Sequence, residues 1–460
     1  MENLVKQTIK PSMKIHKFYL ILAIFFGILM SVFMPFYSEP DGQYHFMKST
    51  AMVGVAPDLS RYGEVTIGTG VDSQKDFYKN GEVIQEYFQN KVVLVNPELL
   101  PRGMDLTNFT SYTFSGHIIP AIGAWVGYHI SPTLGMMNII GRLFSTFIYS
   151  IGMYFIIKFL KYGKLFFATV ALSPVILGSF ASFSYDSLGF ILVALLSMIC
   201  INAISEKRIT GKQVLSIILL APIFYVAVKP NLFTIFLFAI LSIIYCYIQE
   251  HRASQSAYAQ GRARKARKID RSIIFILLVA FGVGAISLWI ITSNYGGVLA
   301  VINRLVFSLG FRFYFTNSPG DVINVLASLY PTINYIPTAM VAVWGGLVLL
   351  ILLQEKKFHD SSLLSLGAFL VILLGVLSTY IGFLGYGDPQ QAGLQSVIQG
   401  VQGRYLTPFL LLLVPLALNK KFDFTFKSLN QNRLLIIIAL VVSFSHVQVL
   451  LNTLYALLNL

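Results

Sequence analysis

The chain has 460 residues, of which 56% are hydrophobic and only 12% are charged, and this balance excludes an ordinary soluble domain. The formal net charge of +14 by itself suggests a nucleic-acid partner. The positions of the basic residues along the chain have to be known before the charge is interpreted in this way. The two cysteines, Cys200 and Cys246, lie inside apolar runs and provide neither a disulfide framework nor a metal-binding spacing.

The first apolar run covers residues 18–37 and follows four lysines, so its start is similar to a secretory signal. The run ends in Met34-Pro35-Phe36-Tyr37, without the small residues of a cleavage site. We therefore predict a retained first span, with residues 1–17 as a cytoplasmic N-terminus.

The later apolar runs predict helices that cross a hydrocarbon core of ~30 Å, since a helix rises ~1.5 Å per residue. They cover residues 135–157, 165–182, 187–204, 213–228, 231–249, 272–292, 332–353, 361–384, 405–418 and 434–456. With the first run they predict an all-α fold, a polytopic transmembrane bundle of about eleven spans that forms one domain over residues 18–460. The shorter stretch 116–131 is expected to lie at or dip into the interface, and the sequence leaves open whether it crosses.

The Lys and Arg residues that flank the spans set the direction of the chain, because short cytoplasmic loops retain basic residues. With the N-terminus inside and 116–131 not crossing, the inside loops hold 23 of the 34 basic residues. Seven of them lie in the cytoplasmic loop 250–271. We interpret this loop as a topology signal that touches anionic head groups, rather than as a nucleic-acid site.

The two long hydrophilic segments, 38–115 and 293–331, then lie outside the membrane. Within the first, Glu82–Asn90 is expected to form a short helix. Within the second, Leu299–Leu309 predicts an interfacial helix with Arg304 on the side opposite its apolar residues.

Two acidic clusters fall at the predicted outer ends of spans. Glu39-Pro40-Asp41-Gly42-Gln43-Tyr44-His45 follows the first span, and its carboxylates and imidazole can supply a general base or bind a metal. The same residues suit a plain turn in which Asp41 caps a following helix. Ser184-Tyr185-Asp186 precedes the run 187–204, where Asp186 is either a functional acid or a residue favoured by the helix dipole.

Two cationic clusters fall on the same side. Lys229-Pro230-Asn231 separates two spans, where the lysine either snorkels or meets a phosphate. In Gln402-Gly403-Arg404-Tyr405, the arginine can hold a phosphate with two parallel hydrogen bonds, and the glycine lets backbone approach a ligand. Arg142 lies inside a predicted span, at a cost of at least ~2.5 kcal/mol. We expect it to have a carboxylate or phosphate partner, with a structural ion pair favoured.

These motifs resemble a bacterial family of polytopic membrane proteins long labelled as a domain of unknown function. Its members carry Pro-Asp-Glu-x-x-His after the first span, Ser-x-Asp before a middle span and Gln-Gly-Arg-Tyr near the end. Here the first motif is Pro40-Asp41-Gly42-x-x-His45, and the other two are the Asp186 and Arg404 motifs above, with Gly141-Arg142-Leu143 and Lys229-Pro230 also in place. Gly42 stands where the family usually has glutamate, so no role of that glutamate carries over.

The family is similar to the GT-C membrane glycosyltransferases, which use sugars carried on polyprenyl phosphate and place a catalytic acid in the first outer loop. This resemblance implies transfer of a monosaccharide from such a donor to a cell-surface glycan, at the outer face of the bacterial plasma membrane. Asp41 is then the general base, and Arg404 and Lys229 bind the donor phosphate. The further substrate-binding candidates are Glu39, His45, Asp186, Gln402 and Tyr405. No cofactor is certain, although His45 and Asp186 could hold a divalent cation.

Two other functions stay open. A transporter or flippase of lipid-linked saccharides would bind its substrate near the bilayer midplane, between broken helices. A glycan polymerase would use the same outer face but a lipid-linked oligosaccharide. The expected partners are the lipid bilayer, a polyprenyl-phosphate-linked sugar and a surface glycan acceptor, with no nucleic acid.

Overall fold

The computed structural model describes residues 13–59, 75–96, 112–258, 289–290, 292–311, 324–329, 336–385, 398, 400–422 and 429–458. The regular elements in these ranges are helices, and the β pairing among them is limited to three isolated bridges. The predicted all-α fold is therefore confirmed.

Six of the described helices are long and apolar enough to cross a membrane. These spans are Ile15–Phe33 (α1), Leu134–Phe159 (α6), Asp186–Glu206 (α9), Pro230–Arg252 (which holds most of α11, Ile235–Tyr258), Ser362–Gly382 (α17) and Gln431–Leu458 (α19). The shorter apolar helices α10 (Gly211–Ala227) and α16 (Thr338–Gln354) lie among them. All eight overlap predicted apolar runs, whereas nearly all of the run 272–292 lies outside the described residues.

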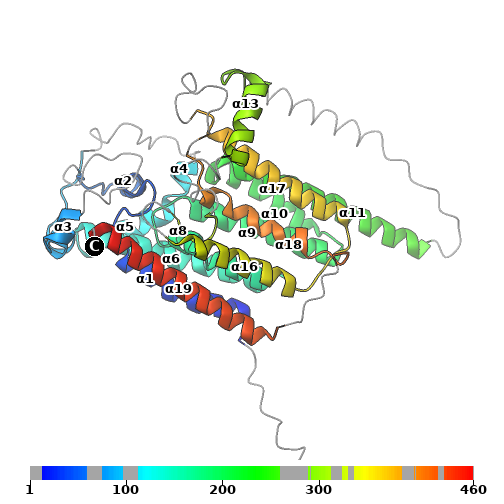
Figure 1. Ribbon diagram of the computed structural model, residues 1–460, viewed down its shortest axis with the longest axis horizontal. Helices are drawn as coiled ribbons and strands as arrows, with labels where there is room; N and C mark the ends of the chain where they lie inside the picture. The colour runs from blue at the N-terminus through cyan, green and yellow to red at the C-terminus, as the bar shows by residue number, and fades with distance from the viewer. Residues whose placement is uncertain are drawn as a thin grey trace, which may run out of the picture.

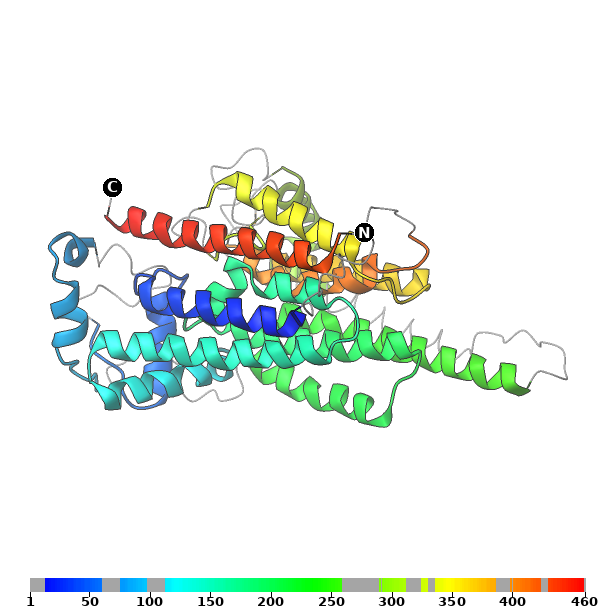
Figure 2. The same cartoon turned by 90° about the horizontal axis from the view of Figure 1, so that it is seen from below.

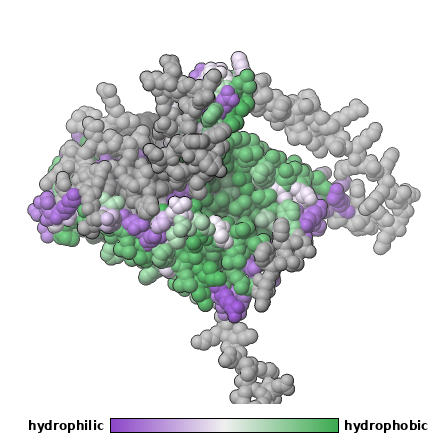
Figure 3. All heavy atoms as spheres, in the orientation of Figure 1, coloured by the Kyte–Doolittle hydropathy of each residue, from purple (hydrophilic) through white to green (hydrophobic). Residues whose placement is uncertain are grey.

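The long helices run side by side in both views of the chain (Figures 1 and 2), with α1 packed against α6 and α19. Their outward faces are apolar: Phe25 is 60% exposed and Leu440 65% exposed. Figure 3 shows a broad hydrophobic surface on one face of the bundle, with hydrophilic residues at its edges. An exposed apolar surface of this extent requires lipid around it, as in a multi-pass membrane protein.

The two ends of the bundle differ in chemistry. At one end the loops after α6, α9 and α16 meet, since Lys161 pairs with Glu206 and Glu355 Oε1 accepts from the backbone N–H of Leu165 (2.8 Å). We call it the basic end; it carries Lys158, Lys161, Lys164, Lys207, Arg208, Lys356, Lys357, Lys420 and Lys421. The other, the site end, holds the end of α1, the start of α9 and the end of α10. The described parts of the predicted inside loops and the predicted outer clusters thus lie at opposite ends.

Two predicted spans are not continuous α-helices. The run 165–182 forms α7 (Lys164–Ala171) and α8 (Pro174–Phe180). The break occurs because Pro174 lacks a backbone N–H, while Ser173 Oγ caps the new helix by accepting from Ile176 N (3.4 Å). The run 405–418 forms the 3₁₀ helix η8 (Thr407–Leu412) and the short α18 (Leu413–Ala417).

The stretch 116–131 forms α5 (Ile118–Ile130), a helix of 13 residues. At ~1.5 Å per residue it is shorter than a hydrocarbon core of ~30 Å. It folds back along the first half of α6, and its glycines allow the contact: a Cβ on Gly123 would lie 2.8 Å from Gly141 Cα. The helix therefore dips beside α6 instead of lying flat on the interface.

The two segments that were predicted to lie outside the membrane contain further short helices. α2 (Gly42–Met52) follows Asp41, and a π-helix covers Gln85–Gln89 (η3), within the helix expected at Glu82–Asn90. The second loop contains α13 (Gly297–Val306). Its Arg304 is buried and donates to the carbonyl of Leu384 (3.2 Å), so the side of α13 that holds Arg304 faces the protein. A buried carbonyl stabilises the guanidinium there, and the helix exposes apolar residues instead, such as Leu299 at 78%.

Candidate functional site

The site end brings together Asp41, Asp186, Lys229 and Arg404, which come from four separate parts of the chain. Arg404 Nη2 lies 3.9 Å from Asp41 Oδ2, and its Nε lies 3.4 Å from Asp186 Oδ2. Lys229 Nζ lies 2.7 Å from Asp186 Oδ1. Two acids and two cations thus form one cluster, here called the charge cluster.

Asp41 reaches the charge cluster from a tight turn between α1 and α2. The residue has a left-handed backbone conformation (φ 57°) and stands at the N-terminal cap of α2, but its carboxylate makes no capping hydrogen bond. The next residue must be small, since a Cβ on Gly42 would lie 2.7 Å from Tyr37 Cα. The turn therefore excludes a larger residue at position 42, and it leaves the Asp41 side chain 24% exposed.

Asp186 opens α9, and the preceding loop fixes it by two successive serine bonds. Ser182 Oγ accepts from Ser184 N (3.1 Å), and Ser184 Oγ accepts from Asp186 N (3.2 Å). The hydroxyls satisfy backbone donors that the helix start leaves open. The Asp186 side chain is 16% exposed and lies between both cations, whereas the Asp41 side chain is 24% exposed.

Lys229 follows the end of α10 and is held between aromatic rings. Its Nζ lies 3.8 Å from the ring centre of Tyr405 and 4.7 Å from that of Tyr185. Ring faces attract a cation most strongly where water is excluded, and the Lys229 side chain is only 16% exposed. The lysine is therefore fixed in the cluster and does not extend freely into solvent.

Arg404 is buried, with 4% of the residue exposed. Its Nη2 donates to the hydroxyl of Tyr405 (3.0 Å), whose ring stacks on Phe383. Within the described residues its Nε and Nη1 are buried without a hydrogen-bond partner, since the Asp186 contact lacks hydrogen-bond geometry. Unpaired buried donors on a charged group cost more than ~1–3 kcal/mol, so they indicate a ligand with acceptor oxygens.

Gly403 has a different role from the one its motif suggested. A Cβ there would lie 2.4 Å from the backbone oxygen of Asn324, so the glycine allows contact with another loop. Thr407 secures the same contact, since its Oγ1 donates to the carbonyl of Val325 (2.5 Å). Gln402, in the same motif, has a buried side-chain oxygen without a hydrogen-bond partner in the described chain.

We expect Gly403→Ala to lower the free energy of unfolding by about 1–3 kcal/mol, because the 2.4 Å contact is with backbone that cannot rotate away. Thermal unfolding of the detergent-solubilised protein measures this effect. Gly345→Ala is the matched control, since nothing lies within 4 Å of its Cβ and alanine favours a helix. Equal stability of the two variants would contradict the packing role of Gly403.

A small cavity of about 20 Å³ adjoins the charge cluster, with room for about one water molecule. Asp186, Lys229, Arg404 and Tyr405 line its polar side, and α8 and the start of η8 supply its apolar side. The cations thus face an enclosed space instead of bulk water, which strengthens their attraction for an anion.

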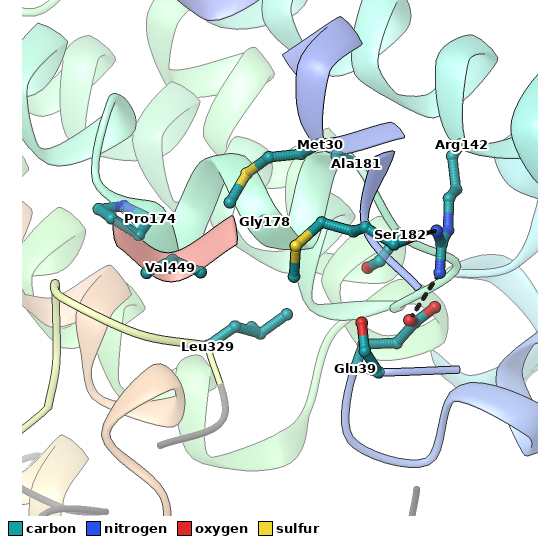
Figure 4. Close-up of a pocket in the computed structure, with 11 residues that line it drawn as sticks. Met30, Glu39, Arg142, Pro174, Gly178, Ala181, Ser182, Leu329 and Val449 are labelled. Atoms are coloured by element: carbon teal, nitrogen blue, oxygen red, sulfur yellow. Dashed lines mark hydrogen bonds and ion pairs between the residues drawn. The ribbon is translucent and has the colours of Figure 1, made fainter. Parts of the chain in front are cut away.

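Glu39 and Arg142 form a separate buried pair behind this cluster. Arg142 Nη2 lies 3.0 Å from Glu39 Oε2, and Arg142 also donates to the carbonyls of Met34 (2.8 Å) and Pro35 (3.2 Å). Figure 4 shows the pair closing one end of a mainly apolar cavity lined by α8, Met30 and Val449. The structure therefore gives Arg142 a carboxylate partner and holds Glu39 away from the charge cluster.

His45 lies on α2, one turn after Asp41, and is buried with His117. His45 Nδ1 and His117 Nε2 are 2.8 Å apart. Burial lowers the pKa of His117 to about 4, and burial, His117, Arg404 and Lys229 together hold the pKa of His45 well below its usual value. Both rings are therefore neutral at pH 7.

His117 and Tyr185 lie beside the charge cluster, although neither was predicted from the sequence as a site residue. Tyr185 sits inside the Ser184-Tyr185-Asp186 motif, and its ring contacts Lys229, His45 and His117. The one sequence signal for His117 is a histidine in an otherwise apolar stretch. Among the described residues, no three His, Cys, Asp or Glu side chains are grouped closely enough to hold a metal ion.

The chain matches a family described as predicted membrane protein (DUF2142) over residues 24–413. The chain belongs to this family. The match includes the whole charge cluster, from the Asp41 turn to the Arg404 motif. No curated protein and no solved structure matches the chain. Family membership therefore establishes a membrane protein, and the chemistry has to be argued from the site.

Proposed function

We propose that the protein is a GT-C-type glycosyltransferase, which transfers a monosaccharide from a polyprenyl-phosphate donor to a cell-surface glycan. One observation carries the proposal: Arg404 is buried with two unused donors, next to Lys229 and within 4 Å of the partly exposed Asp41. A phosphate ester needs donors and positive charge, and an attacking hydroxyl needs a base. Both requirements meet in the charge cluster.

Arg404 and Lys229 bind the donor phosphate in this proposal. The Nε and Nη1 of Arg404, which have no hydrogen-bond partner in the described chain, can each donate a hydrogen bond to a phosphate oxygen. Lys229 supplies a second charge, fixed by the rings of Tyr185 and Tyr405. As the bond from the sugar C1 to the phosphate oxygen breaks, these cations stabilise the charge that develops on the leaving polyprenyl phosphate.

Asp41 is the general base. Asp186 already lies 2.7 Å from Lys229, whereas Asp41 has the longer 3.9 Å contact with Arg404 and the more exposed side chain. Asp41 takes the proton of the acceptor hydroxyl while that oxygen bonds to the sugar C1. No covalent bond to the enzyme forms, so the configuration at C1 inverts. Asp186 holds the two cations in place.

The site end faces the extracytoplasmic side, and the basic end and the N-terminus face the cytoplasm. The distribution of Lys and Arg supports this direction, because the described inside loops collect at the basic end. The isoprenoid tail of the donor lies among the apolar helix faces. Each buried methylene contributes ~0.8 kcal/mol to its binding.

Arg404→Lys tests the proposal. Because lysine presents a single ammonium in place of the several donors of a guanidinium, we expect about tenfold weaker binding of polyprenyl phosphate to the protein in nanodiscs. Arg208→Lys is the control, since Arg208 is 68% exposed at the basic end. If wild type does not bind polyprenyl phosphate, or if Arg404→Lys binds it as tightly, the phosphate site is wrong.

One observation favours a flippase as second candidate: α8, the second helix of the broken pair α7 and α8, lines both cavities, and broken helices line substrate sites in transporters. A transfer assay in proteoliposomes separates the two functions. A transferase releases polyprenyl phosphate and elongates an added glycan acceptor, whereas a flippase moves the intact lipid-linked sugar across the bilayer. A polymerase would require a lipid-linked oligosaccharide in the same assay.

A further inference from the structure

The contacts of the buried His45–His117 pair show which of the two rings donates the hydrogen bond between them. His117 Nδ1 contacts the carbonyl oxygen of Thr113, and a carbonyl only accepts hydrogen bonds. His117 Nδ1 therefore carries the proton. A neutral imidazole has one donor and one acceptor nitrogen, so His117 Nε2 accepts from His45 Nδ1 (2.8 Å).

This order leaves the other nitrogen of His45 unprotonated. Because Nδ1 of His45 is the donor, its Nε2 carries a lone pair and points away from His117. Within the described residues, the His45 ring makes its hydrogen bond with His117, and Nε2 has no partner. The ring lies near the charge cluster, since the charges of both Arg404 and Lys229 act on it.

The ring cannot turn to exchange its nitrogens easily. Its centre lies 4.9 Å from that of Tyr185 and 5.6 Å from that of Tyr44, both in edge contacts. Its backbone N–H donates to the carbonyl of Asp41 (2.9 Å). The acceptor atom is therefore held in a fixed position relative to the proposed base.

We infer that His45 Nε2 accepts a hydrogen bond from a substrate hydroxyl, and that His117 is a positioning residue that fixes the tautomer for this contact. The inference rests on the proposed function. It adds that the site selects the substrate group at this position, because a nitrogen that only accepts hydrogen bonds favours a neutral hydroxyl and disfavours a carboxylate or phosphate. The hydroxyl belongs to the donor sugar or to the acceptor glycan, which have separate KM values.

Two substitutions at His117 test the tautomer. His117→Leu removes the acceptor for His45 Nδ1, so we expect the KM of one substrate to rise about tenfold, with a smaller change in kcat. His117→Gln restores most of the affinity, because its amide oxygen accepts from His45 and its amide nitrogen donates to Thr113. A rise in the donor KM alone assigns the hydroxyl to the donor sugar; a rise in the acceptor KM alone assigns it to the glycan.

His45→Asn decides the question if His117→Leu does not fold. Asparagine can keep the bond to His117 but places no acceptor where Nε2 was, so the same rise in KM is expected. Normal KM values in His45→Asn, or no difference between His117→Leu and His117→Gln, would overturn the inference. Binding of polyprenyl phosphate is measured alongside. The proposed function fails if the wild type neither binds this lipid nor transfers sugar, and only the histidine role fails if the wild type does both.

Discussion

Asp41→Asn is expected to lower the rate of sugar transfer about 10²- to 10⁴-fold, the usual contribution of a positioned general base. Asparagine keeps the shape of the side chain and the turn, but it cannot take the proton of the acceptor hydroxyl. Binding of polyprenyl phosphate should persist, because Arg404 and Lys229 are unchanged. The measurement is transfer of a labelled sugar from polyprenyl phosphate in proteoliposomes.

Glu206→Gln is the matched control for this experiment. Its carboxylate pairs with Lys161 at the basic end, with 37% of its side chain exposed, and such pairs contribute only ~0–1 kcal/mol. Transfer by Glu206→Gln should match that of wild type. If Asp41→Asn retains full activity while Asp186→Asn loses it, the base is Asp186 and the assignment of Asp41 is wrong.

Arg142→Met is expected to destabilise the fold by about 3–5 kcal/mol, because it leaves the Glu39 carboxylate buried without its cation. Glu39 is 4% exposed and its Oε1 has no hydrogen-bond partner in the described chain. The double variant Arg142→Met, Glu39→Gln should recover much of the loss, since no buried charge remains. Denaturant unfolding in mixed micelles measures the three free energies.

Arg208→Met is the control for the buried pair. Arg208 contacts Glu250 at 3.6 Å, and both side chains are at least half exposed, so its loss should change stability by ~1 kcal/mol or less. If Arg142→Met were as stable as Arg208→Met, the Glu39–Arg142 pair would not stabilise the fold. A double variant no more stable than Arg142→Met would show that the arginine acts through its bonds to Met34 and Pro35 instead.

The sequence predicts which residues form the candidate site better than it predicts how their side chains contact one another. Asp41, Asp186, Lys229 and Arg404 stand out because charge at the outer end of an apolar span is costly and needs a reason. That Glu39 pairs with Arg142 and does not join these four residues was not predictable. Glu39 lies two residues before Asp41 yet pairs with Arg142, since the turn between them directs the two side chains differently.

The sequence alone determined the all-α membrane fold, most span positions and the separation of basic loops from the charge cluster. These properties follow from local composition, because each segment partitions into the apolar core of a bilayer, or stays out of it, according to its own residues. Only the tertiary structure decided that Ser173-Pro174 breaks a span, that Arg304 faces inward, and that His117 orients His45. Such contacts depend on which helices pack together, and residues distant in the sequence carry no local sign of that packing.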